Sequence, residues 1–254
     1  MGAYQPLQGR SLSRRLGHTI GTRQMTDTHH GHDRVTLSRN ETESLCMKAA
    51  RGAGFSWGLA EEVGFATGWL AAQGMDGASA LLAMLTRKMP RSAIAGTPKA
   101  VPGHWQSLDD SPLCPIQLGV ALSDRAAIEG GPFNQVTLLD PVDAPLLLLP
   151  FLVRAAQLSQ RTLTLDWQGG RQVITPDGLF NRQAACGWIG QNVLAMKITT
   201  ASTVSAGALL AEPTRLPSIL ASTMNGLGAI ALKTTVPATN ASRSGAGSAT
   251  TDND

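Results

Sequence analysis

Helical and strand-like patterns occupy separate parts of this sequence, and their order is the feature that most constrains the fold. In chain order, the helical patterns span residues 38–52, 56–72 and 78–88, and the strand patterns span 116–122, 135–140, 162–175 and 193–199. A doubly wound parallel sheet requires strands and helices in regular alternation, which this sequence lacks. The order predicts an α+β domain: an N-terminal three-helix cluster followed by a mainly antiparallel sheet with one or two further helices.

Two local signals define the first two helices. Ser38 and Glu41 have the spacing of a capping box, in which each side chain accepts a hydrogen bond from the backbone N–H of the other residue. In the second helix, small residues at every fourth position form a shallow groove along one face. They are Ala60, Gly64, Gly68 and Ala72. Because glycine lowers helix propensity, we expect another backbone to pack closely into this groove in compensation.

The middle and the end of the chain give weaker signals. Residues 91–115 are rich in Pro, Gly and Ser and predict a long loop, which is a suitable place for a lid. Residues 146–149 predict a buried strand with a helix after it over 150–160, and one continuous kinked helix is the alternative. Residues 162–167 alternate strictly and predict the first strand of a hairpin. A last helix is expected over 216–233.

Composition divides the chain into three parts. Residues 1–34 hold five arginines and two aspartates, which account for the whole net charge of +3. This segment has no hydrophobic period and predicts a disordered basic tail, with Met25 as the favoured start. Residues 35–236 form the expected single domain, and residues 237–254 form a low-complexity tail. Because the domain itself is neutral, we expect no nucleic acid among its partners.

The apolar runs, cysteines and histidines limit which membrane segments, compartments and metal sites can be expected. The most apolar run, residues 146–153, is interrupted by a proline and is far shorter than the roughly 20 residues of a spanning helix. We therefore expect no membrane segment. The cysteines Cys46, Cys114 and Cys186 form no paired motif and predict reduced thiols in a cytoplasmic protein. His104 is the only histidine beyond the basic tail, so we expect no His-rich metal site and no cofactor.

The turn between the first two helices is the one stretch that resembles a ligand-binding loop. Its glycines let a backbone approach a ligand, and the free N–H groups of the following helix suit an anion. The residues assigned to this site are Lys48, Arg51, Gly52, Gly54, Ser56, Trp57 and Gly58. A dinucleotide-binding loop would follow a strand, whereas a helix precedes this turn, so a Rossmann site is rejected. The alternative is a glycine-rich turn that binds no ligand.

Three residues are candidates for acid/base catalysis. Glu61 lies among aromatic residues of the second helix, where apolar surroundings suit a general acid, and Glu62 follows it directly. His104 lies in the predicted loop and could act as a base when that loop closes. The alternatives are a solvated pair of first-turn glutamates and a merely exposed loop histidine.

Four short motifs stand out in the sequence. They are LSRNE at 37–41, KAARGAGFSWGLAEE at 48–62, VPAT at 236–239 and GAG at 245–247. With these motifs, the chain resembles a family of uncharacterised bacterial proteins, a domain of unknown function, over about residues 35–247. The resemblance implies a bacterial, cytoplasmic protein that starts near Met25 or later. It implies no activity, so it assigns no role to any residue.

Two hypotheses about function remain. In the first, the protein is a cytoplasmic binder of a small anionic metabolite, a carboxylate or a phosphate, and Glu61 or Glu62 could make it an acid/base enzyme. In the second, it is a non-catalytic accessory or subunit protein whose groove of Ala60, Gly64 and Gly68 receives a partner helix. Self-association into a homo-oligomer is left open.

Overall fold

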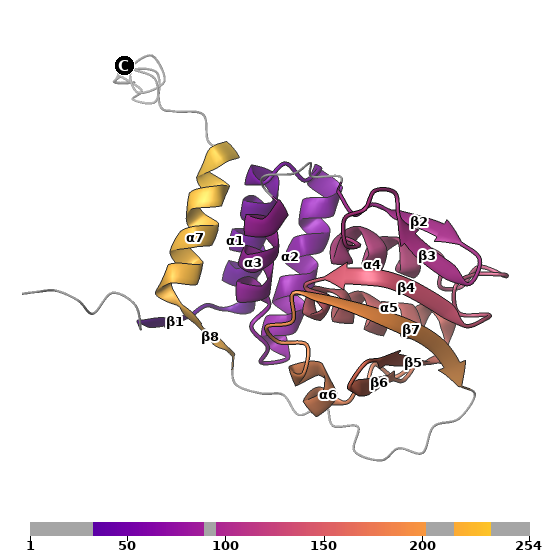
Figure 1. The fold of residues 1–254 in the computed structure, drawn as a ribbon. Coiled ribbons are helices and arrows are strands. Elements are labelled where there is room, and N and C mark those ends of the chain that lie inside the picture. The colour runs from indigo at the N-terminus through magenta and orange to yellow at the C-terminus, as the bar shows by residue number, and fades with distance from the viewer. Residues whose placement is uncertain (1–32, 89–94, 202–215, 235–254) are drawn as a thin grey trace, which may run out of the picture.

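The chain forms a helical cluster beside a sheet, and two further helices pack against the sheet (Figure 1). The structure is a computed structural model, and it describes residues 33–88, 95–201 and 216–234. Helices and strands segregate as the sequence order predicts. The α+β class is therefore confirmed.

The predicted three-helix cluster is confirmed and gains a fourth helix. Its helices are α1 (Arg39–Gly52), α2 (Trp57–Ala72), α3 (Gly77–Lys88) and α7 (Ala221–Ala231). The capping box is present: the Ser38 N–H donates to the Glu41 carboxylate at 2.8 Å, and the Glu41 N–H donates to the Ser38 hydroxyl at 3.2 Å. The helix α7 packs against α1 and α3 and ends in a short 3₁₀ turn, η2 (Leu232–Thr234).

The helix α1 occupies the small-residue groove of α2. A Cβ atom at Gly64 would lie 3.2 Å from the Glu43 carbonyl oxygen, and one at Gly68 would lie 2.1 Å from Cγ of Glu43. The close packing expected for these glycines therefore occurs inside the chain. A partner helix cannot enter this groove while α1 stays in place, and association through another surface stays a prediction.

A six-stranded sheet follows the helical cluster. Its strands, in spatial order, are β2 (Pro98–Val101), β3 (His104–Ser107), β4 (Thr137–Asp143), β7 (Val193–Ala201), β5 (Thr162–Trp167) and β6 (Gly170–Ile174). All neighbouring pairs are antiparallel except β3 and β4, which confirms the mainly antiparallel sheet. The hairpin predicted from the alternation in residues 162–167 is β5–β6.

Two sequence predictions between residues 91 and 124 are wrong. Within the predicted loop 91–115, residues 98–107 form the β2–β3 hairpin, because Gly103 adopts φ +76° in the turn and lets the strands reverse. Residues 116–122 are not a strand but part of α4 (Pro115–Asp124). Pro115 stands in the first turn of that helix, where its missing N–H removes no hydrogen bond.

The strand predicted at residues 146–149 is also wrong. These residues belong to a 3₁₀ turn, η1 (Pro145–Leu148), which leads directly into α5 (Leu149–Ser159). The alternative of a continuous helical segment is closer to the structure. The helix expected over 216–233 begins only at Ala221, after a short strand. In the described part of the chain, four α-helices rather than one or two follow the initial cluster, since α4, α5, the short α6 (Arg182–Cys186) and α7 are all present.

The N-terminal boundary of the domain lies slightly earlier than predicted. Arg34 was assigned to the disordered tail 1–34, but it opens β1 (Arg34–Thr36), which pairs with β8 (Ser218–Leu220). Its guanidinium donates to the Ser218 hydroxyl at 2.8 Å, which fixes this end of the chain to the segment before α7. Residues 1–32 of the predicted tail and the segment 237–254 lie outside the described residues.

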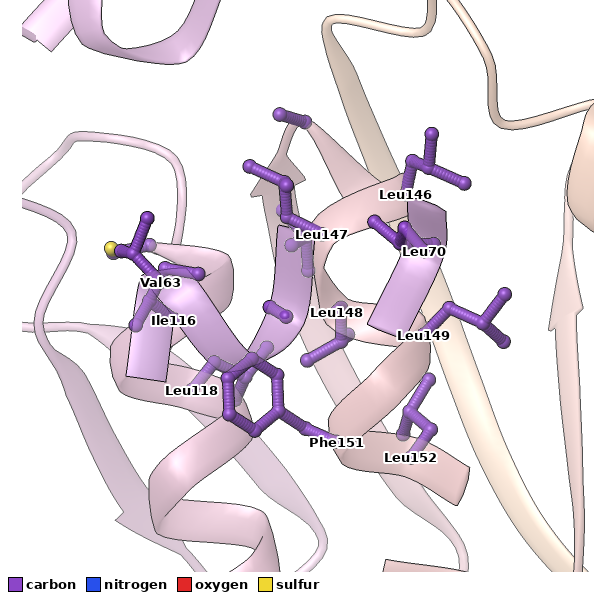
Figure 2. Close-up of a cluster of buried hydrophobic side chains, with 14 of the residues drawn as sticks. Val63, Leu70, Ile116, Leu118, Leu146, Leu147, Leu148, Leu149, Phe151 and Leu152 are labelled. Atoms are coloured by element: carbon purple, nitrogen blue, oxygen red, sulfur yellow. The ribbon is translucent and has the colours of Figure 1, made fainter. Parts of the chain in front are cut away.

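A single cluster of buried side chains runs through the helices and the inner face of the sheet. Figure 2 shows its centre, where Val63 of α2 lies beside Ile116 of α4, and Leu70 of α2 lies beside Leu146. The run Leu146–Leu149 and Phe151 fill the space between these helices, and each is at most 1% exposed. An apolar run buried on all sides has no alternation, so its local pattern does not separate a helix from a strand.

Gln172 is an unusual member of this core. It lies on β6 opposite Leu165, it is 0% exposed, and neither polar atom of its amide has a hydrogen-bond partner among the described residues. An unpartnered buried amide lowers stability by roughly 1–3 kcal/mol. We expect Gln172→Met to raise the free energy of unfolding by about 1–2 kcal/mol in denaturant titrations.

The matched control for this substitution is Gln183→Met on the exposed side of α6. It should change the free energy of unfolding by less than about 0.5 kcal/mol. A loss of stability in Gln172→Met would show that the amide has a partner and would contradict the prediction.

Candidate functional site

The turn predicted to bind an anion is held together by its own arginine. Arg51 donates a hydrogen bond to the Phe55 carbonyl oxygen, and its guanidinium carbon lies 4.5 Å from the centre of the Trp57 ring. The turn therefore uses this cation for its internal structure. Lys48 is exposed on α1 and has no ion pair among the described residues, so it remains the one other cation assigned to this site.

The other residues of the turn also have structural roles. The Ser56 hydroxyl accepts a hydrogen bond from the Leu59 N–H at 3.4 Å and caps α2. Gly54 adopts φ +94°, a conformation that favours glycine, and Gly52 lies against the backbone of α7. Gly58 faces open space, and Trp57 is 63% exposed. The structure therefore brings the predicted turn residues together. Most of them make contacts within the chain that explain their presence without a ligand.

The two glutamates after this turn have different surroundings. Glu61 is exposed, whereas the Glu62 carboxylate accepts a hydrogen bond from Arg154 of α5 at 2.9 Å. The Arg154 guanidinium also lies 3.8 Å from the centre of the Phe65 ring. Glu62 and Arg154 thus form a half-buried ion pair that links α2 to α5. No hydrogen bond or ion pair in the described part of the chain connects either glutamate to His104.

His104, the third predicted catalytic residue, contacts a carboxylate, which is a common partner of a catalytic histidine. It begins β3, and its Nε2 atom lies 2.8 Å from a carboxylate oxygen of Asp140 on β4. The other oxygen of Asp140 accepts the Ser107 N–H at 3.2 Å, and Nδ1 of His104 lies 3.2 Å from the amide nitrogen of Gln106. The Asp140 carboxylate orients the imidazole, and the Gln106 amide N–H faces Nδ1, so a ligand must displace Gln106 before that nitrogen can exchange a proton.

Asp140 also lines a hollow of about 400 Å³ beside this pair. Asp109 and Asp110 also line this hollow, so it carries three carboxylates. Asp109 accepts hydrogen bonds from the Ser107 hydroxyl and from the Gly96 and Ser111 N–H groups, and the Ser107 bond is the main cause of a lowered Asp109 pKa. These contacts fix the turn that follows β3. The hollow is electrostatically unsuited to an anion.

A second hollow, which we call the α3 groove, runs along one face of α3 and has a volume of about 200 Å³. Its floor is a stripe of α3 that begins at Asp76 and ends at Arg87, with Ala80 and Ala83 between them. Residues 188–192 form the opposite wall. Because alanine side chains are small, the middle of the groove is open, while both ends are polar.

Arg87 is the only arginine or lysine among the described residues that lines the α3 groove, and its position is fixed. Its guanidinium donates to the Asp143 carboxylate at 2.5 Å and to the side-chain oxygen of Asn192 at 2.9 Å. Asp143 is 6% exposed, so this ion pair neutralises a buried carboxylate. The Nε atom of Arg87 is buried and has no acceptor within the described ranges.

Trp188 supplies a second hydrogen-bond donor without an acceptor. The residue is 1% exposed, lines the α3 groove, and packs edge-on against the Trp167 ring at 5.4 Å between ring centres. Its indole N–H is buried and has no partner within residues 33–88, 95–201 and 216–234. Buried indole N–H groups are normally hydrogen-bonded. Two residues with an unsatisfied donor therefore line one groove.

The wall of the α3 groove also contains a strained backbone position. Ala144 adopts φ 43° and ψ 62°, the left-handed conformation that non-glycine residues rarely take. Its N–H donates to the Asn192 carbonyl oxygen at 2.8 Å, and this hydrogen bond connects the end of β4 to the wall formed by residues 188–192. Backbone strain of this kind often occurs at ligand-binding sites. The strain at Ala144 therefore favours a binding role for this groove independently of the two donors.

The residues of the α3 groove were not singled out in the sequence because they come from three distant segments. Asp76 has a readable signal as the cap of α3, where it accepts hydrogen bonds from the Ser79 N–H and hydroxyl at 2.9 and 2.7 Å. From the local sequence alone, Arg87 is an ordinary cation in the last turn of a helix. Trp188 gives no signal other than an apolar side chain. Only the tertiary fold brings them together.

The three cysteines are free, and two of them are buried. Burial raises the pKa of Cys46 to about 12, so its thiol stays protonated at pH 8 and lacks the reactive thiolate. We expect iodoacetamide at pH 8 to label Cys186 alone in the folded protein and all three cysteines after unfolding. Mass spectrometry of the peptides checks this, and rapid labelling of Cys46 in the folded protein would contradict it.

Among the described residues, no group of three or more His, Cys, Asp or Glu side chains is arranged to hold a metal ion. Within the same residues, no helix has both the length and the apolar character needed to cross a bilayer.

A known family resembles the first part of the described chain. Residues 37–116 match the model of a family described as a protein of unknown function (DUF3726). No curated protein matches the chain at a significant level. The matched stretch includes the turn after α1, the floor of the α3 groove and His104. The opposite wall, with Trp188 and Asn192, lies outside it.

Proposed function

We propose that the protein binds a small metabolite with a carboxylate group in the α3 groove. One observation carries the proposal: Arg87 and Trp188 both line this groove, and the buried Nε of Arg87 and the buried indole N–H of Trp188 have no acceptor among the described residues. A carboxylate has two oxygens and can accept from both donors. The apolar surface between Ala80 and Leu146 suits the hydrocarbon part of such a ligand.

This proposal keeps the predicted ligand class and changes its site. The turn 51–58 was the expected anion site, but Arg51 is engaged with Phe55 and Trp57 there. The Nε atoms of Arg51 and Arg87 both lack an acceptor among the described residues, but Arg87 shares its groove with a second such residue, Trp188. A carboxylate with a hydrocarbon chain suits the groove better than a phosphate, because the middle of the groove is lined by alanine.

Calorimetric titration of the whole chain with octanoate tests the proposal. We expect saturable binding with one site, and we expect Arg87→Lys to weaken it at least about tenfold, since lysine keeps the charge beside Asp143 but loses the planar donor group. Ala83→Leu should abolish binding because leucine fills the groove. The matched control is Thr86→Leu, an exposed position on α3 that does not line the groove.

The pattern of variants decides between this groove and other sites. Binding that survives Ala83→Leu, or that is lost equally in Thr86→Leu, would contradict the proposal. Absence of binding by octanoate in the wild-type protein would also contradict it. Circular dichroism of each variant establishes that a loss of affinity is not a loss of fold.

A second candidate function rests on the 2.8 Å contact between His104 and Asp140. We propose proton transfer by His104 to or from a ligand in the adjacent acidic hollow, which favours a cationic substrate. The test is proton NMR of metabolite mixtures incubated with the protein and with His104→Asn. Turnover by the wild type alone supports this role, and equal turnover or none in both samples would contradict it.

We also propose that the protein is bacterial and cytoplasmic. The resemblance of its opening motifs to a bacterial family supports the first point. The free thiols of Cys46, Cys114 and Cys186 support the second, because oxidising compartments favour disulfides. Fractionation of cells that produce the protein tests the compartment.

A further inference from the structure

The two ends of the α3 groove carry opposite charges. Arg87 lies at one end of the stripe and Asp76 at the other, 11 residues apart in sequence, which corresponds to roughly 16 Å along a helix. Side chains on a helix lean toward its N-terminus, and the Asp76 carboxylate accepts from Ser79 three residues further on, so the two charged groups lie closer together than their backbone positions. The span left between the two charged groups is then about 10 Å.

Asp76 has hydrogen bonds but no cation in the described part of the chain. Its two carboxylate oxygens accept from the N–H and the hydroxyl of Ser79, which are neutral donors. The half-buried carboxylate of Asp76 therefore has no ion-pair partner within the described residues at the edge of the groove. Each oxygen retains a lone pair for a further donor.

The charge balance of the groove disfavours a simple anion. Asp143 already neutralises Arg87, so Asp76 leaves the groove with an excess negative charge. A carboxylate ligand alone would increase that excess in a partly enclosed site, where charges are poorly screened. A ligand that also carries an ammonium group would avoid this cost and would provide Asp76 with a charged partner.

We infer that the natural ligand of the α3 groove is a linear zwitterion, with its carboxylate at Arg87 and its ammonium at Asp76. This inference rests on the proposed function and specifies its ligand class. An ω-amino carboxylate of about eight carbons has the extended length of roughly 10 Å that the span requires.

The experiment compares 8-aminooctanoate, octanoate and octylamine by calorimetric titration at pH 7 against the whole chain. We expect 8-aminooctanoate to bind at least about fivefold more tightly than octanoate, in keeping with a half-exposed ion pair. Octylamine should also bind more weakly than 8-aminooctanoate, because it lacks the carboxylate for Arg87. In Asp76→Asn the advantage of 8-aminooctanoate over octanoate should disappear, while the affinity for octanoate should stay the same or rise.

Asp76→Asn is a suitable variant because asparagine caps helices as well as aspartate does. It keeps an acceptor for the Ser79 N–H and removes the charge, and its amide N–H can donate to the Ser79 hydroxyl oxygen, which reverses that hydrogen bond. Asp124→Asn, at an exposed position at the end of α4, is the matched control for the change in net charge and should retain the fivefold preference.

The different results separate this inference from the proposed function. Equal affinity of 8-aminooctanoate and octanoate would overturn the zwitterion and leave the carboxylate site intact. Persistence of the preference in Asp76→Asn would overturn the zwitterion in the same way. If none of the three compounds binds, the zwitterion and the proposed function both fail.

Discussion

Replacing Phe151 by alanine should lower the free energy of unfolding by about 3–5 kcal/mol, a large part of the stability of an ordinary domain. Phe151 is 0% exposed at the centre of the cluster in Figure 2, and its ring lies edge-on to Phe65 at 5.6 Å. A Cβ atom at Gly119 would lie 2.3 Å from this ring. The ring thus fills the contact between α4 and α5, and its removal leaves a cavity there.

The measurement is equilibrium unfolding by urea, followed by circular dichroism. Leu158→Ala, on the same helix but at a position that is 52% exposed, is the matched control and should change the unfolding free energy by less than about 1 kcal/mol. Similar losses in the two variants would show that the α4–α5 contact is not the centre of the core.

The second large effect is expected for Gly52→Ala, which should lower the free energy of unfolding by about 3 kcal/mol. A Cβ atom at this position would lie 1.9 Å from the Ile230 carbonyl oxygen and 2.7 Å from its carbon. Both atoms belong to the backbone of α7, which cannot rotate away as a flexible side chain can. The end of α7 must therefore move off α1, or the substituted chain must unfold.

Gly58→Ala is the matched control for this substitution. Gly58 stands in the first turn of α2, and nothing lies within 4 Å of a Cβ atom built there among the described residues. Alanine favours the helix, so this variant should be unchanged or more stable by up to about 1 kcal/mol in the same urea titration. If Gly52→Ala behaves like Gly58→Ala, then α7 does not pack on α1 as described.

The helical part of the fold could be predicted because its signals are local. The capping box at Ser38 and Glu41 marks the start of α1, and the small residues Gly64 and Gly68 predict that another segment packs closely against α2. The structure identifies α1 of the same chain as the element in that groove. The alternation at Leu163 and Leu165 marks a strand with one buried face in the same direct way.

The segments that were wrongly predicted lack such local signals. Residues 116–122 and 146–149 are apolar runs that become largely buried, so few solvent-facing residues reveal whether their period is that of a helix or a strand. The β2–β3 hairpin is short and contains proline and glycine, which are more typical of a loop. Its strand character comes from the pairing of β3 with β4, a contact between distant segments.

The candidate site illustrates the same limit. The residues of the turn 51–58 attract attention because glycines and cations stand close together in the sequence. In the structure Arg51 stabilises the turn itself, which is a local function with the same sequence signal. Arg87 and Trp188, two of the residues with donors that lack partners within the described ranges, are about a hundred residues apart and become a site only when the 188–192 wall lies against α3.

The most direct test of the carboxylate site is an NMR titration of the tryptophan indole N–H groups with octanoate. The chain has five tryptophans, so five signals are expected, and substitution assigns each to Trp57, Trp69, Trp105, Trp167 or Trp188. If a carboxylate binds in the α3 groove, the Trp188 indole proton gains an acceptor and its signal moves downfield more than any other. A titration that moves the Trp57 signal instead would place the ligand at the turn 51–58, and one that leaves the Trp188 signal unchanged would contradict the account.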